Sequence, residues 1–353
     1  MPQLGKETIP TDEPALIARL VEQNLALQDE STRPVRRGQH PKHHGCVRAE
    51  FVVEDTLDAE LRHGLFARPG RYPALIRFSN GAAVDDRKGD AHGMALKLFN
   101  VPGEKLLEPC DTHDFVLLDH PVFFAADVAG YVDLFDALIN AKNSVLPKLA
   151  FFLPRFLAEM GHVYVTYLHK HPAELAIMRA LISKRPDTPL SLQYWSTTPY
   201  LLGPHAVRWS TRPQAGLLKT VKAHDSPDKL RLALAEQLAS GEAAFDFMAQ
   251  LQTDATSMPI EDPRQDWDEM RSPWRKLATL HLPAQKPDTP ALMDFCEHLS
   301  FNPWRCLPEH RPLGGINRAR KAIYDGITRR RHELNGQPLR EPTLEEFQRL
   351  WTA

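Results

Sequence analysis

The spacing of apolar side chains changes along the chain, and each change predicts a different kind of element. Residues 13–30 carry apolar side chains at helical spacing and predict a helix. From Cys46 the period becomes two, with Val47 and Phe51 on one face and Arg48 on the other, which predicts a strand. Similar runs predict further strands at 74–80, 94–99, 114–124, 192–194, 206–210 and 277–282.

Helical spacing returns over residues 128–184, where Pro147, Pro154 and Pro172 interrupt it. Further helices are predicted from Ser226-Pro227 to Gly241, from Thr289-Pro290 onwards, at 316–332 and at 344–351. Clustered strands, a helical insert, more strands and then C-terminal helices form an α+β order rather than a βαβ alternation. This order predicts an antiparallel β-barrel with helices packed around it, without a boundary for a second domain.

Charge and cysteine content exclude several classes of protein. The 353 residues include 43 Lys and Arg against 45 Asp and Glu, so the net charge is -2 and no field attracts nucleic acid or an anionic membrane. The four Cys form no CxxC pair, which favours a reducing compartment. The N-terminus has no apolar signal region, and no run of 18 apolar residues occurs. We therefore expect a cytoplasmic protein that binds neither nucleic acid nor membranes.

The densest candidate chemistry lies between Arg36 and Cys46, which includes His40, His43 and His44. Three His and one Cys suggest a metal site, but their spacing does not match known zinc sites. A solvated basic loop is a second interpretation. A third is one functional His whose positive neighbours hold an anionic ligand.

A second candidate is the pair Arg77 and Ser79, which strand alternation places on one face, opposite an apolar face. Such a pair is also typical of the solvent-exposed face of a sheet. If that face lines a cavity instead, the Ser79 hydroxyl can orient a His and Arg77 can bind a carboxylate.

A third candidate is the pair Arg320 and Tyr324, four residues apart on a predicted helix and therefore neighbours on one face. A guanidinium beside a phenol favours the phenolate form, which is a hard ligand suited to ferric iron. The alternative is a surface cation over an aromatic ring. The following run, 329–332, is either a solvated helix end or a contact for an anionic cofactor.

Together these segments resemble the haem catalase family, in their order along the chain and in the spacing within each motif. The resemblance rests on Arg37 followed by His40, on IRFS at 76–79, on DAHGMALKLF at 90–99, on PVFF at 121–124, and on Arg320 with Tyr324. It covers roughly residues 33–332, and the LQYWSTTPY and FNPW segments add to it.

The resemblance implies haem b as the cofactor and a role for each matching residue. His40 corresponds to the distal acid/base, and Ser79 to the hydroxyl that holds its ring. Tyr324 corresponds to the axial iron ligand, the role that tyrosine has in catalase. Arg320 corresponds to the Arg beside that ligand. The remaining matches are pocket and haem-propionate contacts: Phe123 and Tyr131 for the pocket, and Arg37, Arg77 and Arg331 for the propionates.

The same resemblance implies one catalase-like haem domain over residues 1–353. Its expected parts are an N-terminal helix and arm at 1–32, the barrel at 33–285 with the helical insert at 128–184, and C-terminal helices at 286–353. The chain is shorter than typical catalases, which have a longer N-terminal arm and in some cases a flavodoxin-like C-terminal domain. We therefore expect a monomer or a homodimer rather than the tetramer of the large enzymes.

One departure from the family changes the expected activity. The distal Asn of catalases falls at Leu118, with Asp119 and His120 as possible substitutes, and His43 and His44 replace a Gly-Ala pair near the pocket entrance. We therefore expect a haem-dependent peroxidase, acting on hydrogen peroxide or organic hydroperoxides, with weak catalase activity. The alternatives are a true catalase, a fatty-acid hydroperoxide isomerase or lyase, and a non-catalytic haem-binding protein.

Overall fold

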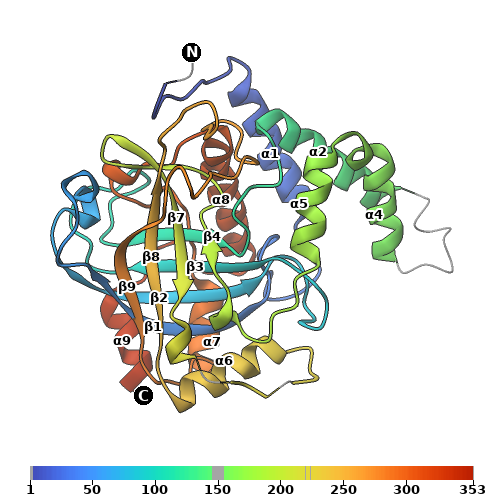
Figure 1. Ribbon diagram of the computed structural model, residues 1–353. Coiled ribbons are helices and arrows are strands. Elements are labelled where there is room, and N and C mark those ends of the chain that lie inside the picture. The colour runs from blue at the N-terminus through green and yellow to red at the C-terminus, as the bar shows by residue number, and fades with distance from the viewer. Residues whose placement is uncertain (1–2, 145–154, 219, 223, 353) are drawn as a thin grey trace.

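A long antiparallel sheet that closes on itself organises the fold, as the computed structural model shows (Figure 1). The structure describes residues 3–144, 155–218, 220–222 and 224–352. Around the ring the strands follow the order β5-β4-β3-β2-β1-β9-β8-β7, a pairing of β5 with β7 closes the ring, and β6 pairs with the other end of β7. The strands are β1 His43–Val53, β2 Arg71–Asn80, β3 His92–Leu98, β4 His113–Leu118, β5 Tyr194–Trp195, β6 Tyr200–Leu202, β7 His205–Pro213, β8 Ala243–Leu251 and β9 Arg275–Leu282.

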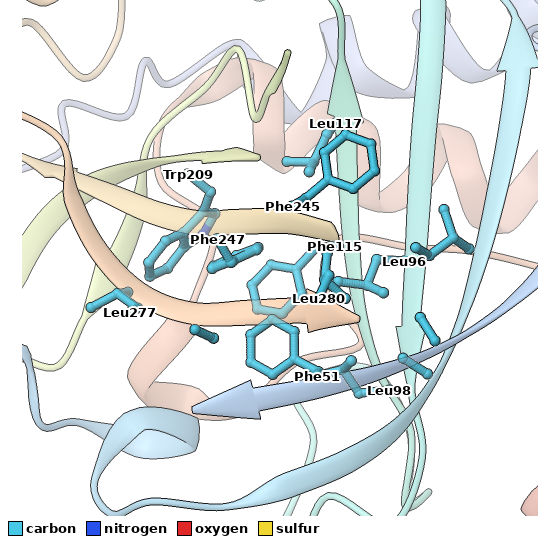
Figure 2. Close-up of a cluster of buried hydrophobic side chains, with 14 of the residues drawn as sticks. Phe51, Leu96, Leu98, Phe115, Leu117, Trp209, Phe245, Phe247, Leu277 and Leu280 are labelled. Atoms are coloured by element: carbon cyan, nitrogen blue, oxygen red, sulfur yellow. The ribbon is translucent and has the colours of Figure 1, made fainter. Parts of the chain in front are cut away.

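Apolar side chains from alternate strand positions fill the interior of the barrel (Figure 2). On β1 the inward side chains include Val47 and Phe51, as the alternation predicts, and the ring of Phe51 meets that of Phe247 edge-on at 5.2 Å. Trp209 of β7 is fully buried in the same cluster. The interior is therefore a packed core, so a ligand site has to lie on the outer face of the barrel.

Helices cover much of that outer face (Figure 1). One group joins α1, α2 and α8 through a second apolar cluster, and α4 and α5 extend from it at one side of the barrel. Another cluster joins the outer faces of β1 and β2 to α7 and α9. The helices are α1 Glu13–Leu27, α2 Val128–Asn143, α4 Arg155–Thr166, α5 Pro172–Ile182, α6 Lys229–Ser240, α7 Pro290–His298, α8 Gly315–Leu334 and α9 Leu344–Thr352.

Two networks of charged side chains tie the ends of the chain to this framework. Arg318 at the start of α8 binds Glu13 of α1 at 2.6 Å and also pairs with Glu7. Beyond α8, Glu341 lies 2.5 Å from the Nζ of the fully buried Lys97, so the segment before α9 is attached to β3. Buried ion pairs of this kind impose one geometry, because separating the partners leaves a charge without compensation.

Most of the predicted elements are present, and the fold class is confirmed. The predicted strand 114–124 is wrong beyond Leu118, because the chain leaves the sheet before Pro121, which cannot donate to a ladder. The strands β6 and β8 are absent from the prediction, and α6 begins at Lys229 rather than directly at Ser226-Pro227. Pro147 and Pro154 lie outside the described residues. No helix within the described ranges is long and apolar enough to cross a membrane.

Candidate functional site

The ring of His40 is held in one orientation at the loop that precedes β1. Its Nδ1 lies 3.0 Å from the Oγ of Ser79, and its backbone oxygen accepts a hydrogen bond from Arg77 at 2.9 Å. Its backbone N–H donates to the oxygen of Gly81 at 2.8 Å, which supports a left-handed φ of 55°. That conformation costs a non-glycine residue about 1–3 kcal/mol, so the surrounding contacts must hold it.

The environment of His40 keeps its imidazole neutral. Loss of solvent and then the charge of Arg77 lower the pKa of His40 to about 3. In the neutral tautomer whose Nδ1–H donates to the Oγ of Ser79, Nε2 is free to accept a proton from a ligand. The side chain can therefore act as a base at neutral pH.

Tyr324 approaches the same space from α8. Arg320, one turn earlier, donates to the Tyr324 hydroxyl at 3.4 Å, and its guanidinium carbon lies 5.4 Å from the ring centre. Thr198 and Asn317 accept hydrogen bonds from Arg320 at 3.2 and 3.1 Å. Burial opposes the charge of Arg320, but the attraction of nearby phenols raises its pKa above the ordinary value. The contact is thus a buried pair and not a surface cation over a ring.

Two adjoining hollows lie between the barrel and α8, and His40 and Tyr324 line both of them. The cavity of the first hollow measures about 90 Å³ and that of the second about 270 Å³, and both hollows are partly open to solvent. Gln39 also lines both hollows, together with apolar side chains of β4 and α8. His40 and Tyr324 therefore lie together in the walls that the two hollows share.

Three guanidiniums line the first hollow: those of Arg37, Arg77 and Arg331. Their nearby carboxylate is Glu297, which lies 3.3 Å from Arg37. Among the described residues, the Nε atoms of Arg77 and Arg331 are buried without a hydrogen-bond partner. Burial and the charge of Arg37 lower the pKa of both residues to about 9. An anionic group placed in this hollow would offset the positive charge of these arginines.

Aromatic and aliphatic side chains line the second hollow. The ring of Phe123 meets that of Tyr131 edge-on at 5.4 Å, and burial raises the pKa of Tyr131 to about 12, so its phenol stays protonated. Leu118 lies in the wall at the position predicted for the distal Asn. Further out, α2 and α5 contribute Leu134, Phe135, Leu138, Met178, Leu181 and Ile182.

All nine residues singled out from the sequence line one or both hollows, although their roles stay predictions. Arg37, Arg77, Ser79 and Arg331 line the first, Phe123, Tyr131 and Arg320 the second, and His40 and Tyr324 both. The outer face of β2 is therefore not exposed to solvent at these positions: Arg77 is 2% exposed and Ser79 is 3% exposed.

The polar neighbours of Leu118, Asp119 and His120, lie outside the walls of both hollows. Asp119 lies 2.8 Å from the Nδ1 of His92 and also contacts Lys184, so its carboxylate is already paired. His43 and His44 are buried at the start of β1, where His44 bonds Asn80 at 2.9 Å. Neither His43 nor His44 belongs to the walls of the two hollows. The interpretation of this stretch as a solvated basic loop is thus wrong from Lys42 to His44.

Four further residues line the site or bind its side chains but were not predicted from the sequence: Gln39, Gly93, Asn317 and Glu297. Gly93 lies so close to His40 that a side chain there would collide with the ring, and its signal was present as the Gly in DAHGMALKLF. The side chains of α2 and α5 carried no signal, because their part in the hollow depends on how the helices dock. Nowhere in the described ranges do three or more His, Cys, Asp or Glu side chains meet in a way that could hold a metal ion.

Comparison with known proteins identifies the fold. The amino-acid sequence matches no family model, and no curated protein matches it. Solved structures match over almost the whole chain, and they define the class: this is the catalase fold, an antiparallel barrel with helices packed around it.

The solved structures that match this chain are catalases by name. A fungal catalase matches with 17% identity and a TM-score of 0.60, over 95% of this chain and 67% of that one. A bacterial catalase matches with 16% identity and a TM-score of 0.62, over 97% and 66%. Catalase A from Saccharomyces cerevisiae matches with 18% identity and a TM-score of 0.60, over 97% and 72%. The chain thus spans about two thirds of the length of these proteins.

Proposed function

We propose that this chain is a haem-dependent, catalase-like peroxidase that reduces hydroperoxides. The observation that carries the proposal is that His40 and Tyr324 line the same two hollows, and that three arginines line the first of them. The catalase fold of the structural neighbours supports it. We propose that the whole chain, residues 1–353, acts as one catalase-like domain in the cytoplasm, as a monomer or a homodimer.

The donor set fits haem b. Tyr324 would supply a phenolate ligand to iron, favoured by the guanidinium of Arg320. Arg37, Arg77 and Arg331 would pair with the two propionates, whose negative charges would offset the positive charge buried there. When bound, haem supplies the redox-active iron that this chain's side chains cannot provide.

The residues around that group have separate tasks. His40, kept neutral, would accept at Nε2 the proton of the hydroperoxide's near oxygen and return it to the far oxygen, which assists cleavage of the O–O bond. Ser79 would hold Nδ1 so that Nε2 keeps its direction. The apolar side chains of the second hollow would exclude water and give space to an organic substituent.

The identity of the reductant separates a peroxidase from a catalase. A catalase uses a second hydrogen peroxide, which needs a polar donor beside His40, and Leu118 offers none. Asp119 is paired with His92 and does not replace it. This supports a peroxidase with weak catalase activity and a preference for organic hydroperoxides.

The apolar lining of the second hollow favours one further candidate, a fatty-acid hydroperoxide isomerase or lyase. Such an enzyme rearranges its substrate without an external reductant. Product analysis with a fatty-acid hydroperoxide separates the two: an alcohol formed at the expense of an added donor supports the peroxidase, and an isomer formed without a donor supports the alternative.

The primary test is an absorption spectrum of the haem-reconstituted chain beside Tyr324→Phe, followed by assays with hydrogen peroxide and tert-butyl hydroperoxide. We expect stoichiometric high-spin ferric haem, a changed spectrum in the variant, slow oxygen release and faster turnover of the alkyl hydroperoxide. Rapid oxygen release would make the protein a true catalase. Stoichiometric haem without turnover of either peroxide would make it a haem-binding protein, and absence of haem binding would overturn the proposal.

A further inference from the structure

Two cysteines from distant parts of the chain meet on the outer face of the barrel. Cys46 lies on β1 and Cys296 on α7, and both are free thiols that are 0% exposed. They share the apolar cluster that joins these elements, and each thiol affects the pKa of the other. The Sγ of Cys296 lies 3.6 Å from the backbone oxygen of Gly45, the neighbour of Cys46. The two cysteines are therefore neighbours across the contact between β1 and α7.

Two polar side chains act on the thiol of Cys296. His43 and Arg77 both help to lower its pKa, and Arg77 also acts on Cys46. His43 Nδ1 and Arg77 Nε are buried and, within the described ranges, have no hydrogen-bond partner. A thiolate at Cys296 would place a negative charge beside these groups, although nothing in the proposed peroxidase chemistry requires a thiol there.

The two thiols differ in acidity as an attacking and a resolving cysteine do. Burial opposes the thiolate of Cys296, but the hydrogen bond from Cys46 and the influence of His43 outweigh it, so the pKa of Cys296 falls well below its usual value. Burial, together with the contact to Cys296, raises the pKa of the Cys46 thiol. The thiolate is the nucleophile in sulfur chemistry, so Cys296 is the sulfur that reacts first.

We propose that Cys46 and Cys296 form a redox-active pair that hydroperoxides oxidise to a disulfide. The Cys296 thiolate attacks the terminal oxygen of the hydroperoxide, the O–O bond breaks, and the alkoxide takes a proton to leave as an alcohol, or as water from hydrogen peroxide. Cys46 then attacks the resulting sulfenic sulfur, the S–S bond forms, and the expelled hydroxide takes the Cys46 proton. Two thiols lose two electrons, and one hydroperoxide gains them.

Arg77 connects this pair to the first hollow, because its side chain lines that hollow and also contacts Cys296. Only a small oxidant reaches a sulfur that is 0% exposed, so the pair is selective by size. Oxidation removes the negative charge of the thiolate from beside Arg77, which changes the balance of charge at the arginines of the hollow. The thiol reaction does not rest on haem binding, and it can be tested without haem.

The test is a map of the oxidised cysteines in the full-length, haem-free protein after one equivalent of hydrogen peroxide. Free thiols are alkylated under denaturing conditions, and peptides are identified by mass spectrometry before and after reduction with dithiothreitol. We expect one disulfide, Cys46 to Cys296, that dithiothreitol reverses. Cys306 is a matched internal control, since it is equally buried but lies near Asp114, which helps to raise the pKa of its thiol. Oxidation of Cys306 at the same rate, or no disulfide between Cys46 and Cys296, would overturn the proposal.

Variants distinguish the roles of the two sulfurs. In Cys46→Ser the reaction stops at a Cys296 sulfenic acid that dimedone traps, whereas Cys296→Ser leaves Cys46 unmodified. His43→Gln slows disulfide formation about tenfold, because less thiolate is present, and Cys306→Ser leaves the rate unchanged. Circular dichroism checks that each variant is folded. Equal rates in the wild type and in His43→Gln, or a sulfenic acid that forms on Cys46 first, would contradict the assignment.

Discussion

The ring of His40 lies directly against the backbone of Gly93, so that a Cβ at Gly93 would come within 2.7 Å of two ring atoms. The Oγ of Ser79 lies 3.0 Å from Nδ1 and holds the ring in place at the same position. Gly93 and Ser79 are paired across β3 and β2, so the sheet itself fixes the direction of the imidazole. A base that the barrel positions in this way needs no rearrangement before it accepts a proton.

We expect Gly93→Ala to displace the ring of His40 and to lower kcat for hydroperoxides by about 100-fold, since catalysis depends on near-ångström placement. Haem content and KM should change little. The measurement is steady-state kinetics of the reconstituted variant. Gly161→Ala is the matched control, because nothing lies within 4 Å of a Cβ at that position of α4. Equal kcat values in the two variants would refute the role of the Gly93 contact.

Arg331→Gln is expected to weaken haem binding at least about tenfold, because a buried cation that pairs with an anion is lost. The haem-free variant should be as stable as the wild type or more stable, since Arg331 is buried beside Arg37 and its Nε has no partner within the described ranges. Haem titration and urea unfolding measure the two effects. Arg329→Gln, at an exposed site on the same helix, is the control. Unchanged haem affinity in Arg331→Gln would remove this residue from the site.

Leu118→Asn should raise the rate of oxygen release from hydrogen peroxide, because it places an amide donor in the wall of the second hollow. We expect an increase of about tenfold or more, the range that one well-placed donor contributes. An oxygen electrode measures the rate, with tert-butyl hydroperoxide turnover recorded in parallel. Leu138→Asn, in the part of the wall that α2 contributes, should give no gain. If Leu118→Asn also gives none, the missing amide does not limit catalase activity.

The protein should lose stability in mild acid. Burial lowers the pKa of His310 to about 4, from an ordinary value of 6.5. Below pH 6.5 this residue therefore binds a proton in the unfolded chain but not in the folded one. The free energy of unfolding should then fall by about 1.4 kcal/mol per pH unit from this residue, down to pH 4. Urea unfolding at pH 7 and pH 5 measures the change.

His310→Gln tests that origin, since Gln can still accept the hydrogen bond from the Leu65 N–H, which His310 accepts at 2.9 Å. The free energy of unfolding of this variant should fall less steeply with decreasing pH, by the slope that corresponds to about one bound proton. His281→Gln on the exposed side of β9 should keep the wild-type slope. An unchanged slope in His310→Gln would assign the acid sensitivity to other groups.

The sequence predicted elements well where one face of an element is buried and the other is not. Val47 and Arg48 alternate in this way, so β1 was predicted correctly. Strand β8 was missed, because Ala and Gln have low strand propensity and its place depends on pairing with β7 and β9. The strand 114–124 was predicted too long, since its apolar side chains continue beyond Leu118 into the wall of the second hollow.

The candidate site was predicted from motifs, and its position on the outer face of the barrel was not. Arg77 and Ser79 alternate with apolar residues, as residues on a solvent-exposed face of a sheet do. Only the packing of the C-terminal segments against β2 shows that this face is buried. The pairing of Asp119 with His92 follows from the register of β3 and β4, which no local pattern encodes. The shape of the second hollow depends on the docking of α2 and α5 in the same way.

The order of elements along the chain has a consequence for synthesis. The strand that follows His40 pairs with β9, so the barrel ring cannot close on any fragment that ends before Leu282. No fragment that ends before α8 contains both His40 and Tyr324, because Tyr324 lies on α8. A nascent chain on the ribosome therefore cannot bind a ligand between these two side chains until α8 has been made.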